Sequence, residues 1–453
     1  MRAIRFALLV ISKLLLRYKF KIILVLVISS ILTYGIYSFV FASTKSRLSE
    51  GIVGTFTEND LPPIVTQLVS KGLVEIDKTG SPSGQLAKEW TSNDQSTEYW
   101  FKLKDDLYWS DGTKLKAADL PVSIPNVEIT TPDDRTMHFK LSDSYSPFPS
   151  LLTKPLLKKN TNIGIGPYQI AKIYKDGVFV KKLQLHARDQ ALPDVTIHFY
   201  PNERIAKTAL RIGEVASILG INDPEDLTPD KSFNLFSQPS FGVVVTIFYN
   251  TEDPVLSDEN LRLALSYSAP SIPNETEART SLSPQSWAFN NTVKDYLDNQ
   301  EGAKNALAKV KNKDLVITLT ATSSLKNIGE QVIASWKKAG IKAVLRTESG
   351  IPQNFQALLI AQKIPADPDQ YSLWHKLGQT NISKFSNPRM DKDLEDGRKL
   401  KDISQRRLKY ADFQKVLLDH SPASFLYFPK YNVLYLKKVE PELKKVLELQ
   451  ILE

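Results

Sequence analysis

The chain has 453 residues, of which 42% are apolar and 24% charged, a balance typical of a globular protein with more than one hydrophobic core. Its formal net charge is +8, but residues 1–47 hold eight basic side chains and no acidic one, so residues 48–453 carry no net charge. This distribution argues against a nucleic-acid partner, because the basic excess flanks a hydrophobic segment. The chain has no cysteine, which excludes disulfides, thiolate nucleophiles, thiolate zinc sites and a lipid-modified cysteine.

Residues 22–42 form a largely apolar run without a charged side chain, long enough to cross a hydrocarbon core of about 30 Å as a helix. Six of the eight basic residues lie before it, in residues 1–21. The positive-inside rule therefore predicts a single-pass protein of the cell membrane, with a basic cytoplasmic segment and an extracytoplasmic body. The alternative is a signal peptide cleaved after Val40-Phe41-Ala42. The run is longer than a typical signal core, which favours an uncleaved anchor followed by a tether at residues 43–50.

After the tether, strand-like and helix-like stretches alternate without internal repeats, which predicts an α/β protein. Residues 121–149 carry five prolines and a strand-like MHFKL segment, so this part is predicted to be rich in strands and loops. Asp298 is predicted to begin a helix, because Glu301 gives the spacing of a capping box and an apolar stripe starts at Ala303.

The clearest unit covers residues 315–346. It reads as a strand VITLT, a helix with Trp336 on its apolar face, a closing Gly340 and a strand AVLR. A crossover of that length predicts two parallel strands. A further helix is predicted to follow Ser404 and to end before Pro422.

No motif for catalysis or for metal binding is present. The five histidines are scattered without the spacing of a zinc helix, and there is no nucleophile elbow and no phosphate-binding glycine loop. Gly164-Ile165-Gly166 lacks the third glycine of a dinucleotide site. The acid pairs Asp105/Asp106 and Asp133/Asp134 are typical of solvated turns rather than of glycosidase carboxylates. The sequence therefore predicts a protein that is not an enzyme, with no catalytic residues, no metal and no cofactor.

All six tryptophans lie in the body of the chain. For most of them core packing is the simpler interpretation. Trp287 and Trp374 differ, because each lies in a segment rich in Pro, Ser or Asp, where a loop is favoured.

Several segments, in order, resemble the family 5 extracellular solute-binding proteins, the oligopeptide and dipeptide receptors of ABC importers. The most specific is YWFKLKDDLYWSDGTKLKAADL at residues 99–120. The others are GLVEID at 72–77, QLAKEW at 85–90, GPY at 166–168, FYN at 248–250, NLRLAL at 260–265, DPDQY at 367–371 and NISKFSN at 381–387. The resemblance covers nearly the whole body.

The resemblance implies a two-lobed periplasmic-binding-protein-like fold of type II, in the large peptide-receptor class, behind one N-terminal transmembrane helix. The chain would cross the hinge twice, with lobe I at residues 51–250, lobe II at 251–425 and a return to lobe I at 426–453. A peptide or a related small solute would bind between the lobes, and the partners would be the permease subunits of an ABC importer and the membrane. The alternative is a membrane-anchored sensor or chaperone-like binding protein of the same fold that serves no transporter.

Two departures from the family pattern stand out. The segment at 120–134 is short where the family has a longer helical insertion, so the minor subdomain of lobe I is expected to be reduced. Family members that bind peptides place an aspartate, the partner of the peptide α-amine, three residues before the position of Asp367, and here that position is Ile364. We therefore expect recognition of the peptide amine to be altered.

The ligand site is predicted from loop residues that combine carboxylates and rigid aromatic faces. The predicted substrate-binding residues are Asp367, Asp369, Tyr371, Trp374 and Trp287. For the two aspartates a second interpretation stays open, in which they only cap the helix that follows.

Overall fold

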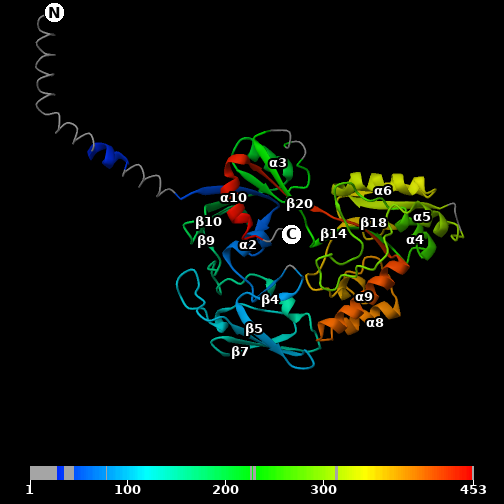
Figure 1. The fold of residues 1–453 in the computed structure, drawn as a ribbon, viewed down its shortest axis with the longest axis horizontal. Helices are drawn as coiled ribbons and strands as arrows, with labels where there is room; N and C mark the ends of the chain where they lie inside the picture. The colour runs from blue at the N-terminus through cyan, green and yellow to red at the C-terminus, as the bar shows by residue number, and fades with distance from the viewer. Residues whose placement is uncertain are drawn as a thin grey trace, which may run out of the picture.

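The computed structural model describes residues 28–34, 45–77, 79–224, 227, 231–311 and 315–450. Figure 1 shows two lobes that face one another. The predicted cytoplasmic segment 1–21, and the predicted span 22–42 except for the helical residues 28–34, lie outside the described residues. No helix within the described ranges is long and apolar enough to cross a membrane.

The core of lobe I is an eight-stranded sheet of order β13-β20-β12-β1-β11-β10-β2, in which β9 also pairs with β10. The strands are β1 (Arg47–Val53), β2 (Phe56–Thr57), β9 (Tyr168–Asp176), β10 (Phe179–Ala187), β11 (Asp194–Tyr200), β12 (Ser217–Leu219), β13 (Phe233–Pro239) and β20 (Lys430–Leu436). The central strand β1 runs parallel to β11 and β12, and it begins inside the stretch that the sequence suggested as a tether. Helices α2 (Pro63–Val69), α3 (Glu203–Arg211) and α10 (Glu440–Leu447) pack against this sheet.

A smaller unit, which we call the small domain, occupies residues 73–165 and lies below the lobe I sheet in the view of Figure 1. It holds the hairpin β3 (Val74–Ile76) and β4 (Pro82–Gly84) and an antiparallel sheet β5-β6-β8-β7. Those strands are β5 (Ala87–Ser92), β6 (Glu98–Leu103), β7 (Val127–Asp133) and β8 (Thr136–Leu141). Phe101, Phe139 and Phe148 pack edge to face at its centre. The predicted strand MHFKL is confirmed as β8.

Lobe II is built on a six-stranded sheet of order β15-β19-β14-β18-β16-β17. The strands are β14 (Val243–Tyr249), β15 (Thr276–Glu277), β16 (Val316–Thr322), β17 (Lys342–Glu348), β18 (Ala357–Lys363) and β19 (Ala423–Phe428). The predicted strand-helix-strand unit is confirmed as β16, α6 (Lys326–Lys338) and β17, with the two strands parallel. Trp336 of α6 is fully buried, and its indole N–H donates to the carbonyl of Leu265 at 2.9 Å.

The other lobe II helices are α4 (Glu259–Tyr267), α5 (Gln300–Leu307), α7 (Tyr371–Trp374), α8 (Pro388–Gly397) and α9 (Ile403–His420). The helix predicted after Ser404 is confirmed as α9, which ends at Ser421 in a left-handed conformation before the proline. The capping box predicted at Asp298 is wrong. Asp298 has a positive φ of 54°, and the neighbouring Asn299 caps α5 by accepting from the Gly302 N–H at 2.8 Å.

The chain passes between the two large sheets twice, once from β13 to β14 and once from β19 to β20. The two crossings touch each other, because the Ser240 N–H donates to the Pro429 carbonyl at 2.8 Å. They lie at residues 239–243 and 428–430, whereas the resemblance placed the lobe boundaries at 250 and 426. The difference comes from β14, a continuous buried strand whose apolar run does not indicate which sheet it joins.

Candidate functional site

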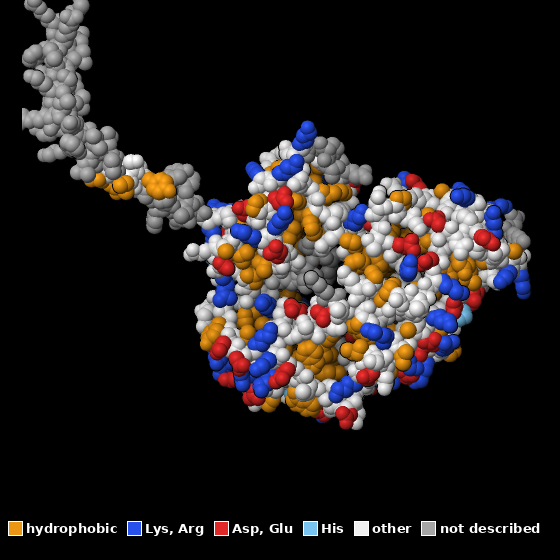
Figure 2. Space-filling model, viewed as in Figure 1, with side chains coloured by type: hydrophobic (Ala, Val, Ile, Leu, Met, Phe, Trp, Pro, Cys, Tyr) orange, Lys and Arg blue, Asp and Glu red, His pale blue; other side chains and the backbone are white. Residues whose placement is uncertain are grey.

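A large cleft of about 1870 Å³ separates the lobes. Figure 2 shows the surface hollowed where lobe I and lobe II face one another. Its walls come from three parts of the fold: the lobe I sheet with α2, the small domain, and the edge of lobe II near both crossings. Apolar lining residues from these parts include Phe56, Leu61, Leu157, Ile170, Phe241 and Tyr431. A pocket between domains with apolar walls is the usual setting of a ligand site.

Charged side chains of both signs also line the cleft. The carboxylates are Glu58, Asp60, Glu75 and Asp77, and the ammonium groups are Lys154, Lys158, Lys159 and Lys363. Part of this charge is neutralised within the protein, because Lys158 lies 2.8 Å from Asp111 and Lys175 is paired with Glu58. The hydrogen bond from Lys175 and a second one from Asn162 hold the pKa of Glu58 below its usual range.

Ile364 lies in the cleft wall on the lobe II side. Its backbone N–H donates to the Gly242 carbonyl at 2.8 Å, which fixes this wall to the first crossing. Its side chain packs against the apolar cluster of lobe II rather than presenting a charge. At this point of the wall the cleft therefore offers a ligand an apolar surface.

Asp367 is buried and paired with Arg406, whose Nη2 lies 2.6 Å from Oδ1 of the carboxylate. The same guanidinium lies 5.0 Å from the centre of the Trp287 ring and donates to the Tyr410 hydroxyl at 3.1 Å. Burial raises the pKa of Asp367, and the nearby Arg406 cation opposes that shift by favouring the ionised form. Two of the five predicted site residues, Asp367 and Trp287, thus meet around one arginine.

Asp369 and Tyr371 meet around a second arginine. Nη2 of Arg398 lies 3.0 Å from the Asp369 carboxylate, and its guanidinium carbon lies 4.2 Å from the centre of the Tyr371 ring. The carboxylates also hold the turn before α7, since Asp367 accepts from the Asp369 N–H at 3.0 Å and Asp369 accepts from the Tyr371 N–H at 3.2 Å. These bonds stabilise the turn that leads into α7, but neither aspartate is the N-cap of that helix, which is Gln370 without a side-chain cap bond.

Trp374 lies in the core of lobe II rather than in a loop at the cleft. It is 1% exposed and packs between Phe248 and Phe425, at ring-centre distances of 5.6 and 5.8 Å. Among the described residues that line the cleft, none of the five predicted site residues occurs, although Ala366 and Pro368 on either side of Asp367 do. Ligand contact by these five residues stays a prediction. In the structure each of them contacts other side chains of the chain: four lie beside Arg398 or Arg406, and Trp374 packs in the core.

Sequence reasoning missed the two arginines. A signal for Arg406 exists in the sequence: it precedes Tyr410, Phe413 and Leu417 at spacings of four, seven and eleven residues, and these four side chains share the buried face of α9. An arginine at such a position indicates an internal ion pair. No comparable pattern marks Arg398, which follows the end of α8.

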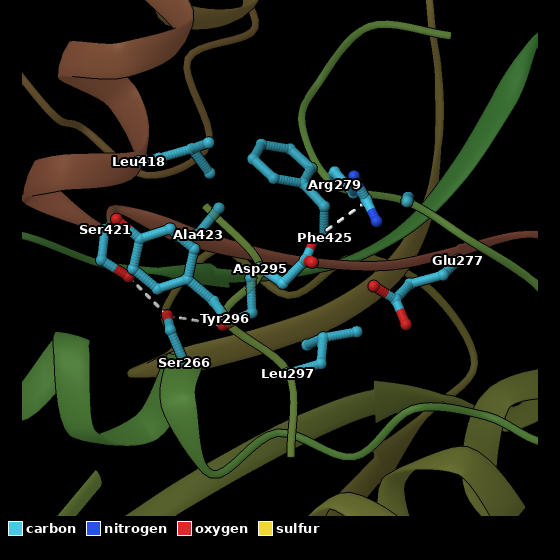
Figure 3. Close-up of a pocket in the computed structure, with 12 residues that line it drawn as sticks. Ser266, Glu277, Arg279, Asp295, Tyr296, Leu297, Leu418, Ser421, Ala423 and Phe425 are labelled. Carbon is cyan, nitrogen blue, oxygen red and sulfur yellow. Dashed lines mark hydrogen bonds and ion pairs between the residues drawn. The ribbon is translucent and has the colours of Figure 1, made fainter. Parts of the chain in front are cut away.

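A second pocket lies within lobe II, between the end of α9 and β19 (Figure 3). Its volume is about 20 Å³, which leaves room for about one water molecule. Its hydroxyl groups bond one another: Ser266 lies 2.7 Å from Ser424, which lies 2.6 Å from the Tyr249 hydroxyl. This pocket is too small to hold a solute, and its hydroxyl groups are already hydrogen-bonded to one another. The cleft is therefore the candidate site.

Comparisons with known proteins agree with the geometry. The family model described as "Bacterial extracellular solute-binding proteins, family 5 Middle" matches residues 120–384. The chain is 23% identical over 425 residues to the probable D,D-dipeptide-binding periplasmic protein DdpA of Escherichia coli, covering 79% of this chain and 81% of that one.

Solved structures show the same fold. The ABC transporter substrate-binding protein CtaP of Listeria monocytogenes superposes with a TM-score of 0.74 at 20% identity, covering 86% of this chain and 94% of that one. DppA of Helicobacter pylori in complex with the peptide STSA gives a TM-score of 0.64 at 19% identity, covering 88% and 96%. The predicted two-lobed α/β fold is confirmed.

Proposed function

This chain belongs to the bacterial extracellular solute-binding proteins of family 5, and we propose that it captures a small peptide or a related solute between its lobes. The substrate-binding component of an ABC importer is the role that such capture serves, and a permease is the partner that receives the solute. The members of this family bind solutes and are not enzymes, which agrees with the absence of catalytic motifs from the sequence.

The observation that carries the proposal is the cleft itself. Its volume of about 1870 Å³ exceeds the roughly 300–1,000 Å³ of typical small-molecule pockets, so a ligand the size of a peptide fits between the lobes. Apolar walls suit peptide side chains, and lysines and carboxylates at separate points suit the polar backbone and its termini. Relatives named for dipeptides, such as the dipeptide-binding protein of E. coli at 22% identity, support this class of ligand.

We propose that the α-amine of a bound peptide is not paired with a carboxylate at the position of Ile364. That side chain is apolar and lies in the cleft wall. The segment 367–374 would then affect the ligand indirectly, by holding the cleft wall in place. Ala366 and Pro368 line the cleft, and Asp367 between them is buried.

We further propose that residues 22–42 anchor the protein in the cell membrane, with the body on the extracytoplasmic side, since the run is long, uncharged and preceded by basic residues. A full-length chain that stays in the membrane fraction after alkaline washing supports the anchor. A soluble processed form that begins at Ser43 would refute it.

Mass spectrometry of the solute retained by the full-length chain, purified in mild detergent, tests the proposed function. We expect short peptides or a related solute at near-equimolar occupancy, and we expect permease subunits to copurify. Capture of a solute without any permease under crosslinking would favour the alternative role as a sensor or chaperone-like protein. Turnover of peptides, sugars or phosphoesters that a single substitution abolishes would contradict both.

A further inference from the structure

The two lobes touch at a second place, away from the crossings. The contact joins the small domain, at Tyr145 and Ser146, to lobe II at Asp369, Tyr371 and Arg398, and we call this set of five residues the arginine seam. The guanidinium carbon of Arg398 lies 4.9 Å from the centre of the Tyr145 ring and 4.2 Å from that of Tyr371. One cation from lobe II is thus placed against an aromatic ring of each lobe.

Backbone groups of the seam are bonded across the lobes as well. Arg398 is the residue that ends α8, so its carbonyl is one of the helix-terminal acceptors without a partner in the helix. Ser146 supplies the missing donors, because its N–H and its hydroxyl both donate to that carbonyl, at 2.8 and 3.1 Å. The C-terminus of a lobe II helix is therefore capped by the small domain of lobe I.

Two more interlobe bonds flank the seam. The backbone N–H of Trp287 in lobe II donates to the Thr79 carbonyl at 2.8 Å. The Lys401 ammonium of lobe II donates to the Ser92 carbonyl at 3.3 Å. All of these bonds join the small domain to lobe II, and none of them involves a residue of the two crossings. Together with the seam they join the small domain directly to lobe II.

A carboxylate beside an aromatic face is a place where a cation can bind. Here the carboxylate of Asp369 and the ring of Tyr371 are occupied by the chain's own guanidinium. We infer that Arg398 is a closure residue: it joins lobe II to the small domain through Tyr145 and Ser146, so the lobes close without a contact from a ligand amine. This inference rests on the proposed function, because closure matters only to a protein that captures a solute.

The experiment measures the distance between the lobes in the full-length chain without added solute. Because the chain has no cysteine, Glu128→Cys in the small domain and Leu408→Cys in lobe II give two unique labelling sites, both exposed. Pulsed electron spin resonance between spin labels at these positions reports the distribution of closed and open forms. The purified chain is first stripped of retained solute by partial unfolding and refolding.

Removal of the Arg398 side chain in Arg398→Ala is expected to lower the ratio of closed to open form by about two- to thirtyfold, as loss of a cation–π contact predicts. Tyr145→Leu is expected to act in the same direction, and Tyr145→Phe, which keeps the ring and loses only the hydroxyl that interacts with Arg398, is expected to lie closer to the wild type than Tyr145→Leu does. Arg389→Ala is the matched control, since it removes an arginine of lobe II that pairs with Asp412 on the exposed surface. It is expected to leave the distances unchanged.

Distance distributions that stay at the wild-type values in both Arg398→Ala and Tyr145→Leu would overturn the inference. If Arg398→Ala does not fold, Tyr145→Leu decides the question, because it leaves the Arg398–Asp369 pair of lobe II in place. The outcome is separate from that of the proposed function. A seam that controls closure in a chain that retains no solute would refute the function alone, and a chain that retains peptide with unchanged distances would refute the seam alone.

Discussion

The buried pair of Asp367 and Arg406 gives the sharpest prediction about stability. Both side chains are less than a tenth exposed, and the guanidinium also bonds the Gly397 carbonyl at 3.0 Å and the Tyr410 hydroxyl. Asp367→Ala removes the carboxylate and leaves a buried cation with neutral partners only. Breaking a buried pair in this way costs about 3–5 kcal/mol.

Urea unfolding of the full-length chain, followed by tryptophan fluorescence, measures this cost as a shift of the lobe II transition to lower urea. The double variant Asp367→Leu/Arg406→Met is expected to recover most of the loss, because an apolar pair of similar volume carries no desolvation penalty. Arg389→Ala, which breaks an exposed pair with Asp412, should change the free energy of unfolding by less than about 1 kcal/mol. A cost below about 1 kcal/mol for Asp367→Ala would refute the reasoning.

Three further predictions concern single sites. Glu50 is fully buried on β1, and burial raises the pKa of its carboxyl from 4.5 to about 8. Because the unfolded chain releases this proton at a lower pH than the folded chain does, the free energy of unfolding of the wild type should fall as pH rises from about 5 to 9. Glu50→Gln should lack that loss and exceed the wild type by up to about 5 kcal/mol at pH 9, and parallel pH profiles of the two melting temperatures would contradict this. Trp374→Ala should destabilise lobe II by about 3–5 kcal/mol in chemical unfolding, as expected for a core aromatic, and a smaller loss than about 1 kcal/mol would speak against its buried position. N-acetylation of a peptide ligand should weaken binding by less than about tenfold in titrations, because Ile364 offers no carboxylate, and a larger loss would show that the amine is recognised elsewhere.

The elements that the sequence predicted well are those defined by local periodicity. The unit β16–α6–β17 and the helix α9 have long apolar stripes and clear ends, and both occur where they were expected. The strand β14 shows the limit of such reasoning. Its run of apolar residues predicts a buried strand, but the partner strands β18 and β19 are over one hundred residues away in the sequence, so its lobe could not be inferred.

The candidate site was harder to predict than the fold for a physical reason. The pattern of carboxylates and aromatic rings at 367–374 indicates a place for a cation, and the structure fills that place with Arg398 and Arg406 from the same chain. A ligand cation and an arginine distant in the sequence satisfy such a pattern equally well. Only the fold determines which of the two is present.

The most direct test of the central claim, capture of a solute in the cleft, is the occupancy of a variant whose cleft is obstructed. Asn59 lines the cleft and is exposed, so Asn59→Trp adds bulk there without disturbing the core, and Lys337→Trp on the exposed face of α6 is the matched control. Quantitative mass spectrometry of the solute that copurifies with each full-length chain should show wild-type occupancy in the control and a loss of about tenfold or more in Asn59→Trp, as expected for about 1.4 kcal/mol or more of lost binding energy. Equal occupancy in the two variants would contradict the assignment of the cleft as the binding site.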